Sequence, residues 1–239
     1  MKKTTDIAIQ CDLTHTNIEQ DEEIDSSDPP KYTLMQTLQT NWIFYITIIL
    51  CIGYLSRFNS LNFVVMIYSL VAFSLLGYVV HYVSHHINFT EMYKRSNNYI
   101  TRNPILNYFM TKICNFMDFH DATHHNLEIN KTPMNILYEF FNNLMMQGLI
   151  VIGVIKLSQF LSLKMALLWG LFYATYHNIN LLLDPTPTHM YHHKDKHSNY
   201  GIDAWDIFLG TKHPETPLDN YNLASINVII ITLVINWLS

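Results

Sequence analysis

Three clusters of histidine dominate the chemistry that this sequence could perform. They read HYVSHH at residues 81–86, HDATHH at residues 120–125 and HMYHHKDKH at residues 189–197, and with the isolated His177 they contain eleven of the thirteen histidines. Imidazole is the commonest metal ligand in proteins at neutral pH. The clusters therefore predict a site for more than one metal ion, with these candidate ligands: His81, His85, His86, His120, His124, His125, His177, His189, His192, His193 and His197.

The spacing within the clusters is typical of ligands carried by helices. Residues four apart lie on the same face of a helix, so His81 and His85 can reach one ion, as can His189 and His193. His192, three residues after His189, is nearly as well aligned. In the last cluster Pro185 and Pro187 should end the preceding helix, and we expect Thr188 to cap a new one.

The spacing alone does not identify the metal. An all-imidazole site suits zinc, copper, nickel and iron alike. Soluble di-iron bundles use an ExxH pattern and zinc proteases use HExxH, and neither pattern occurs here.

Long apolar segments flank the histidine clusters and must position them. Of all residues, 49% are hydrophobic and only 14% are charged, which is typical of a membrane protein. A helix needs about 20 residues to cross the hydrocarbon of a bilayer. Five segments approach that length, and we expect them to span at residues 36–56, 58–80, 134–155, 163–183 and, less clearly, 221–239.

Short connections pair these segments into two hairpins. The first and second are separated only by a turn near Arg57, and the third and fourth by residues 156–162. The fold class expected is therefore all-α integral membrane, with four to five transmembrane helices in hairpins and a histidine-rich helical cap that holds a di-metal site.

The hairpins place all eleven candidate ligands on the side of the membrane that carries the N-terminus. Eleven of the fourteen Lys and Arg residues fall on the same side, and the other three are Arg57, Lys156 and Lys164. Cytoplasmic loops are enriched in Lys and Arg. We therefore expect the clusters to face the cytoplasm.

The remaining sequence bounds the domain organisation and excludes several functions. Residues 1–31 are expected to form an acidic disordered tail, and residues 32–239 one membrane-embedded domain. No basic patch of the kind that binds nucleic acid is present. Cys11, Cys51 and Cys114 form no CxxC pair, and no secretory signal peptide is evident after Lys2 and Lys3.

The C-terminal third resembles the fatty acid hydroxylase/sterol desaturase superfamily. HMYHH from His189, the following HSNYG and the string AWDIFLGT ending at Thr211 are similar to that family's final HxxHH, NYG and WD-x-LFGT motifs. The earlier HxxxH and HxxHH motifs would correspond to His81 with His85 and to His124 with His125. His177 would be the further histidine before the last cluster. The resemblance covers roughly residues 65 to 211.

This sequence departs from the family pattern at three places. A strict middle motif would have histidine at position 121, where this chain has Asp121, and the available histidine is His120. The stretch between Gly201 and Trp205 is shorter than is usual. His86 is an additional histidine, and His197 matches an extra histidine of some members.

The resemblance implies a di-iron, O2-dependent membrane oxidoreductase that hydroxylates an unactivated C–H bond of a fatty acyl chain or sterol. It implies two iron ions, with zinc as a substitute in purified protein. The partners implied are a membrane lipid, O2 and a separate electron donor such as a b-type cytochrome with its reductase. The expected location is the endoplasmic reticulum, as a multi-pass protein.

Alternatives remain open. The same scaffold could carry a lipid desaturase. A histidine-rich metal transporter is a non-enzymatic alternative, although its ligands should lie near the bilayer midplane. A bis-histidine haem protein would leave most of the clusters unexplained.

A few polar residues besides the histidines are candidates for supporting roles. Carboxylates could orient the imidazoles, and the candidates are Asp118, Asp121, Asp184, Asp195 and Asp206. Trp205 with Asp206 is expected to brace the C-terminal loop. Glu139 and Asn142–Asn143 fall inside or at the edge of the third segment, where polar groups are costly and often functional.

Overall fold

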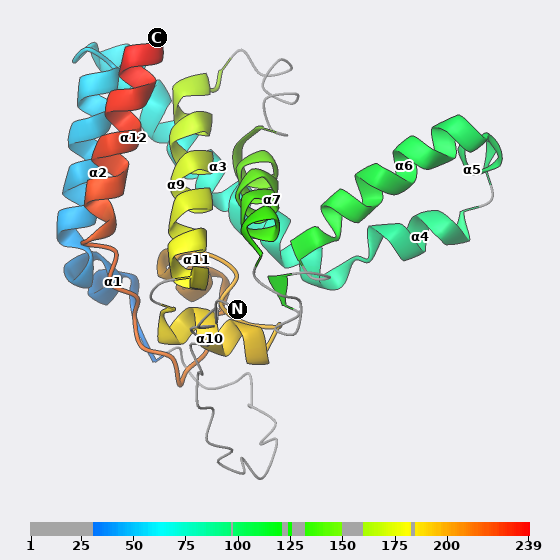
Figure 1. The fold of residues 1–239 in the computed structure, drawn as a ribbon. Helices are drawn as coiled ribbons and strands as arrows, with labels where there is room; N and C mark the ends of the chain where they lie inside the picture. The colour runs from blue at the N-terminus through cyan, green and yellow to red at the C-terminus, as the bar shows by residue number, and fades with distance from the viewer. Residues whose placement is uncertain (1–30, 97, 121–123, 126–131, 150–159, 183–184) are drawn as a thin grey trace, which may run out of the picture.

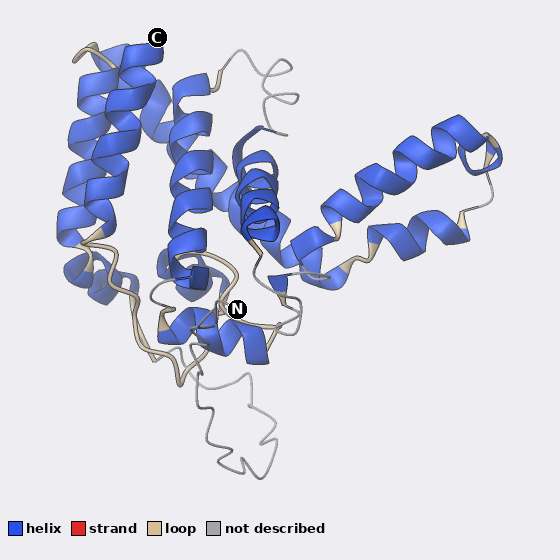
Figure 2. Ribbon diagram, in the orientation of Figure 1, coloured by secondary structure: helices blue, strands red, loops and turns tan. Residues whose placement is uncertain are grey.

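The structure is a computed structural model that describes residues 31–96, 98–120, 124–125, 132–149, 160–182 and 185–239. Every regular element in these ranges is helical (Figure 2). The all-helical part of the predicted fold class is therefore confirmed. The predicted acidic tail, except for Lys31, lies outside the described residues, as do Asp121, Asp184 and residues 150–155 of the third predicted span.

The first predicted span is broken into two helices. α1 (Leu34–Thr40) and α2 (Trp42–Leu55) meet at Asn41 with a bend of 79°. The buried Asn41 side chain donates to the carbonyl oxygen of Asp219 at 2.9 Å and accepts from the backbone N–H of Tyr221 at 2.6 Å. These bonds to a distant loop stabilise the break, which hydropathy alone does not show.

The second predicted span is longer than expected. α3 (Ser60–His86) begins after the turn at Arg57 and Phe58, which have positive φ, and Asn59 caps its first turn. The helix continues past residue 80, so that His81 and His85 lie one turn apart at its end. In the described chain, α3 is the one helix whose length and composition suit a membrane span, and the bent α1–α2 pair would add a second if counted as one.

The other long helices complete a bundle around α9 (Leu163–Leu182). α9 packs against α3, α7 (Pro133–Leu144), the π-helix η2 (Met145–Leu149) and α12 (Ala224–Leu238), and α12 also packs on α2. Buried apolar side chains such as Phe73 and Phe172 form the core between them. α12 is apolar but has only 15 residues. The four-to-five-span topology therefore stays a prediction.

A helical arm projects from the bundle between α3 and α7 (Figure 1). It consists of α4 (Phe89–Arg95), α5 (Tyr99–Arg102) and α6 (Pro104–Met117). At its base the Asp118 carboxylate accepts hydrogen bonds from the backbone N–H groups of Phe89 and Thr90, at 2.8 and 2.7 Å. The arm leaves the end of α3 and returns beside it, so it delivers the middle histidine cluster to the first one.

Two short helices lie across the end of the bundle where α3 and α9 finish (Figure 1). They are α10 (Pro187–Lys194) and α11 (Asp203–Leu209). The predicted cap Thr188 is wrong by two residues: Thr186 caps α10, because its hydroxyl accepts the backbone N–H of His189, and Pro187 takes the first helical position. Thr188 is buried and its hydroxyl donates to the carbonyl of Pro217 at 3.2 Å.

Candidate metal centre

Nine of the eleven candidate histidines converge at one end of the bundle. α3 carries two of them, the turn after α6 carries three, α9 carries one and α10 carries three. They form a five-histidine group, His81, His85, His120, His125 and His192, and a set around His124, His177, His189 and His193. The clusters thus become one site because four separate elements end at the same place.

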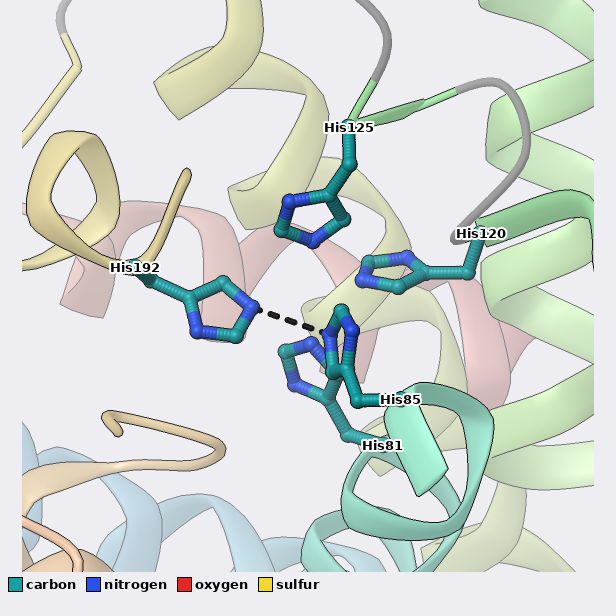
Figure 3. A group of neighbouring side chains, drawn as sticks. All are labelled: His81, His85, His120, His125 and His192. Atoms are coloured by element: carbon teal, nitrogen blue, oxygen red, sulfur yellow. Dashed lines mark hydrogen bonds between the residues drawn. The ribbon is translucent and has the colours of Figure 1, made fainter. Parts of the chain in front are cut away.

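The five-histidine group is compact. Its ligand nitrogens all lie within 4.8 Å of one another. The Nε2 atoms of His192 and His85, from α10 and α3, are 3.1 Å apart, and the rings of all five point inward toward one another (Figure 3).

The second set adjoins the first. Nitrogens of His124, His189 and His193 lie within 4.8 Å of one another, and the Nε2 atoms of His193 and His189 are 3.1 Å apart. His177 adds its ring at 4.4 Å from that of His124 and 4.9 Å from that of His189. The set therefore offers a second metal position.

Two of the three His-His pairs, His124–His125 and His192–His193, are divided between the two groups. His125 and His192 belong to the five-histidine group, and their neighbours His124 and His193 belong to the second set. Consecutive residues on a helix point about 100° apart, so a pair can serve two adjacent ions. In the middle cluster the His125 backbone N–H donates to the carbonyl of His120, five residues earlier, at 3.3 Å. This π-type turn brings His120 into the five-histidine group although it is one residue out of the strict HxxHH pattern.

Backbone carbonyls fix the orientation of two ligands. Nδ1 of His81 lies 2.6 Å from the carbonyl oxygen of Tyr200, and Nδ1 of His192 lies 2.6 Å from that of Ser198. A carbonyl oxygen can only accept, so in each ring Nδ1 carries the proton. Nε2 then keeps its lone pair for a metal ion.

The loop that supplies these carbonyls is held by Asp206. Its buried carboxylate accepts hydrogen bonds from the backbone N–H of Tyr200 at 2.8 Å, the backbone N–H of Gly201 at 3.0 Å and the hydroxyl of Thr211 at 2.8 Å. Burial raises the pKa of Asp206 to about 6, although these three bonds favour the charged form. Trp205 donates to the Ser74 hydroxyl at 3.0 Å and so ties α11 to α3. The NYG and WD motifs thus brace the loop, as expected for Trp205 and Asp206.

The ring nitrogens fit a bound metal better than a hydrogen-bond network. Within the described residues, both nitrogens of His124 and His125 and the Nε2 atoms of His81, His120 and His177 are buried without a hydrogen-bond partner. Such atoms are rare in native proteins, and bound metal ions would satisfy them. The chemistry of the donor set therefore suits metal ions.

Four of the imidazoles, those of His120, His124, His125 and His192, have lowered pKa values that favour the neutral form. Burial lowers the pKa of His192 to about 3, and the neighbouring His85 adds to this effect. Burial and nearby imidazoles likewise hold the pKa values of His120, His124 and His125 well below the usual range. Neutral imidazole is the form that binds metal.

Two predicted ligands are not brought into the site. His86 is exposed, stacks on Tyr82, and its Nδ1 lies 2.8 Å from that residue's carbonyl oxygen. His197 is also exposed and lies beside His86. Residue 86 follows His85 by one position and so points about 100° away around α3. The structure therefore brings together nine of the eleven predicted ligands and leaves His86 and His197 apart from them.

Among the described carboxylates, Glu139 contacts two of the clustered imidazoles, although the prediction did not include it in the ligand set. Asp118 caps α4, Asp195 accepts the backbone N–H of His197, and Asp206 holds the loop, whereas Glu139 lies 3.2 Å from His124 Nδ1 and 3.5 Å from His177 Nε2. The sequence signal was present, because Glu139 is an acidic residue within an apolar segment.

Comparisons of this chain with protein-family models, with curated proteins and with solved structures give no match. The geometry of the site and the sequence motifs therefore carry the functional proposal by themselves.

Proposed function

We propose that this chain is a membrane-embedded di-iron oxidoreductase that uses O2 to hydroxylate an unactivated C–H bond of a lipid. The observation that carries the proposal is the pair of adjacent, buried imidazole groups at one end of a helical bundle. The WD and NYG residues that resemble the hydroxylase family hold the loop whose carbonyls orient two of the ligands.

Two iron ions bound by these groups would supply reductive activation of O2 and removal of hydrogen from carbon. The protein's own contribution is to hold the ligands neutral and oriented and to exclude bulk water. A cavity of about 60 Å³ borders His81 and His192 of one group and His177 and His189 of the other. Its position suits a small molecule such as O2 next to both ions.

An exposed apolar face of α7 and an apolar cavity both support a lipid environment. The buried residues of α7 and η2 are polar, whereas Leu137, Tyr138 and Phe141 on the same helix are 47–51% exposed. This arrangement is inverted relative to a water-soluble helix and suits contact with hydrocarbon. A second, almost wholly apolar cavity of about 330 Å³ between α1, α2, α3, α9 and α11 shares Ile202 with the 60 Å³ cavity. Because Ile202 lies between the two cavities, we propose that an acyl chain in the larger cavity reaches the site by displacing the Ile202 side chain.

The rest of the proposal concerns the cellular setting. The chain would be a multi-pass protein of the endoplasmic reticulum with its histidines facing the cytoplasm. Electrons would come from a separate donor such as a b-type cytochrome with its reductase.

The test compares the wild-type protein with His193→Ala and His197→Ala in a host whose lipids can be extracted. We expect two metal ions per wild-type chain, mainly iron, and a lipid that gains one oxygen by mass spectrometry. His193→Ala should lose both metal and product, because it removes a clustered ligand. His197→Ala should retain both, because its imidazole is exposed and outside the groups.

Three outcomes would change the proposal. One zinc ion per chain, or no stoichiometric metal, contradicts a di-iron centre. A lipid that loses two hydrogens instead of gaining oxygen identifies a desaturase. Unchanged lipids from a metal-loaded protein with a working electron donor would contradict lipid oxidation altogether.

A further inference from the structure

A stripe of buried polar side chains runs along the inner face of α7 and η2. Glu139, Asn142, Asn143 and Gln147 follow one another at helical spacing, and each is at most 4% exposed. Burial of a polar side chain is costly unless it finds a partner. Each side chain in the stripe therefore requires a hydrogen-bond partner or an opposite charge inside the protein.

Two members of the stripe have structural partners. The Asn142 side-chain amide donates to the carbonyl of Phe116 at 2.7 Å, which ties α7 to the end of α6. The Gln147 amide donates to the carbonyl of Gly77 at 3.2 Å, where a Cβ on residue 77 would collide with the Gln147 side chain. These bonds fix α7 and η2 against the arm and α3.

Glu139 has different surroundings. One oxygen, Oε1, accepts a hydrogen bond from the Asn143 amide at 3.2 Å. The same oxygen lies 3.2 Å from His124 Nδ1 and 3.5 Å from His177 Nε2, and neither nitrogen has a hydrogen-bond partner among the described residues. The carboxylate and imidazoles are therefore close without being hydrogen-bonded.

These distances are the ones expected between ligands of one metal ion. Nitrogen and oxygen ligands lie about 2.0–2.2 Å from a transition metal, so neighbouring ligand atoms are about 3.0–3.5 Å apart. His120 of the five-histidine group also has a ligand atom within 4.8 Å of those of Glu139 and His177, but among the described residues the ion-pair contacts of Glu139 are both with members of the second set, His124 and His177. The Glu139 oxygen thus stands where a further ligand of the second metal position would stand.

The charge of Glu139 leads to the same assignment. Among the described residues its ion-pair contacts are with His124 and His177, and no Lys or Arg approaches within ion-pair distance. A buried carboxylate requires a partner of opposite charge, and a metal ion between these three side chains would provide it.

We propose that Glu139 is an anionic ligand of the second metal ion, together with His124, His177, His189 and His193. This inference rests on the metal-binding part of the proposed function. The five-histidine group then holds its ion with neutral nitrogen donors, while the second ion has one carboxylate oxygen. The two ions are chemically different, and the second position favours the harder, more highly charged state of iron.

The test measures metal content and spectra of purified protein, without reference to turnover. The variants are Glu139→Gln, which keeps the side-chain shape and the Asn143 contact, and Glu91→Gln, the same change at an exposed Glu on the arm. We expect wild type and Glu91→Gln to carry two ions per chain. In Glu139→Gln the affinity of one position should fall by at least about 10- to 100-fold, so that the content approaches one ion.

A second measurement on the wild-type protein does not depend on folding of a variant. Iron-57-loaded protein should show two ferrous Mössbauer doublets of different quadrupole splitting. Two ions in Glu139→Gln with spectra equal to wild type would overturn the Glu139 assignment and leave the di-metal centre intact. A wild-type protein without metal would instead overturn the proposed function.

Discussion

Neighbouring histidines in this protein belong to different groups of candidate metal ligands. His124 and His125 point into different groups, as do His192 and His193, so two adjacent imidazoles bridge the space between two metal positions without sharing an ion. A His-His pair also fixes the separation of the two groups to that of adjacent side chains on one helical turn. Two ions bound by these groups would therefore lie close together.

The neutral state of the imidazoles predicts how the metal-free protein responds to pH. The folded-state pKa of His192 is about 3, below the value near 6.5 of an unfolded histidine. Between these values the unfolded chain binds a proton that the folded chain does not, so stability falls as the pH decreases from about 6.5 toward about 3. His120, His124 and His125 shift in the same direction.

Thermal unfolding of the metal-free protein in detergent, measured over roughly pH 4 to 8, checks this expectation. The midpoint should decrease below about pH 6.5, because the lowered pKa values of the four histidines outweigh the raised pKa of Asp206, which acts in the opposite direction. His197→Ala should show the same slope, because the exposed His197 is outside the groups. A midpoint that is constant or rises toward acid pH would contradict the assignment of buried neutral ligands.

At the residue level, much of the site was predictable from the sequence. Nine of the eleven predicted ligands meet in the structure, because the i, i+4 rule applies at the ends of α3 and α10. The exclusion of His86 and His197 depends on the directions of single side chains. The recruitment of Glu139 depends on α7 packing beside α9, which no local pattern encodes.

Among the elements, the loop between α10 and α11 has the largest influence on the site. It supplies the carbonyls of Ser198 and Tyr200 to two ligands, and Asn199 adopts a left-handed conformation, φ 58°. Asp206, in the first turn of α11, stabilises this loop conformation because its carboxylate accepts hydrogen bonds from the backbone N–H groups of Tyr200 and Gly201. Ligand orientation therefore depends on a side chain that touches no ligand.

Replacement of Asp206 by Asn should test this dependence. The amide oxygen can still accept from Tyr200, but the amide nitrogen would face the Gly201 N–H, where both groups are donors. We expect a loss of stability of about 2–3 kcal/mol and a metal affinity lower by about 10- to 100-fold. Denaturant titration and metal analysis measure the two effects.

Asp195→Asn provides the matched control. Asp195 is partly exposed and its carboxylate accepts a single backbone N–H, that of His197, at 3.0 Å. An Asn oxygen can retain that bond, so stability should change by less than about 0.5 kcal/mol. Equal effects of the two substitutions would contradict a special role for Asp206.

The elements themselves were predicted in part. Hydropathy located α3 and α9 well, but it missed the break at Asn41, because partners about 180 residues away stabilise that break. It also ended α3 too early, since polar His81 and His85 continue the helix beyond the apolar run. The helical arm of α4, α5 and α6, which lies between α3 and α7, was not predicted from the sequence.

In the whole molecule, the helices alternate in direction, and the candidate metal site lies at one end of the bundle. α2 and α12 start at the histidine end, whereas α3 and α9 finish there (Figure 1). This up-and-down order is the one that two hairpins require. This order brings His81 and His193, which are far apart in the sequence, to the same end of the bundle.

Cysteine labelling tests the proposed membrane orientation. In a variant without the three native cysteines, Phe58→Cys places a thiol in the exposed turn between α2 and α3, and Lys194→Cys places one at the exposed end of α10. An impermeant maleimide added to the cytoplasmic side should label position 194 and spare position 58. Labelling of both positions from one side would contradict a spanning α3.

The length of α3 has a consequence for any lipid that reaches the site. From Ser60 to His81 the helix rises about 32 Å at 1.5 Å per residue, close to the hydrocarbon thickness of about 30 Å. If Ser60 marks one boundary of the bilayer, the first ligand stands at the other boundary, level with the lipid headgroups. Under the proposed function, the length of α3 would then determine which carbon is oxidised, because it sets how far the lipid must be drawn out of the bilayer.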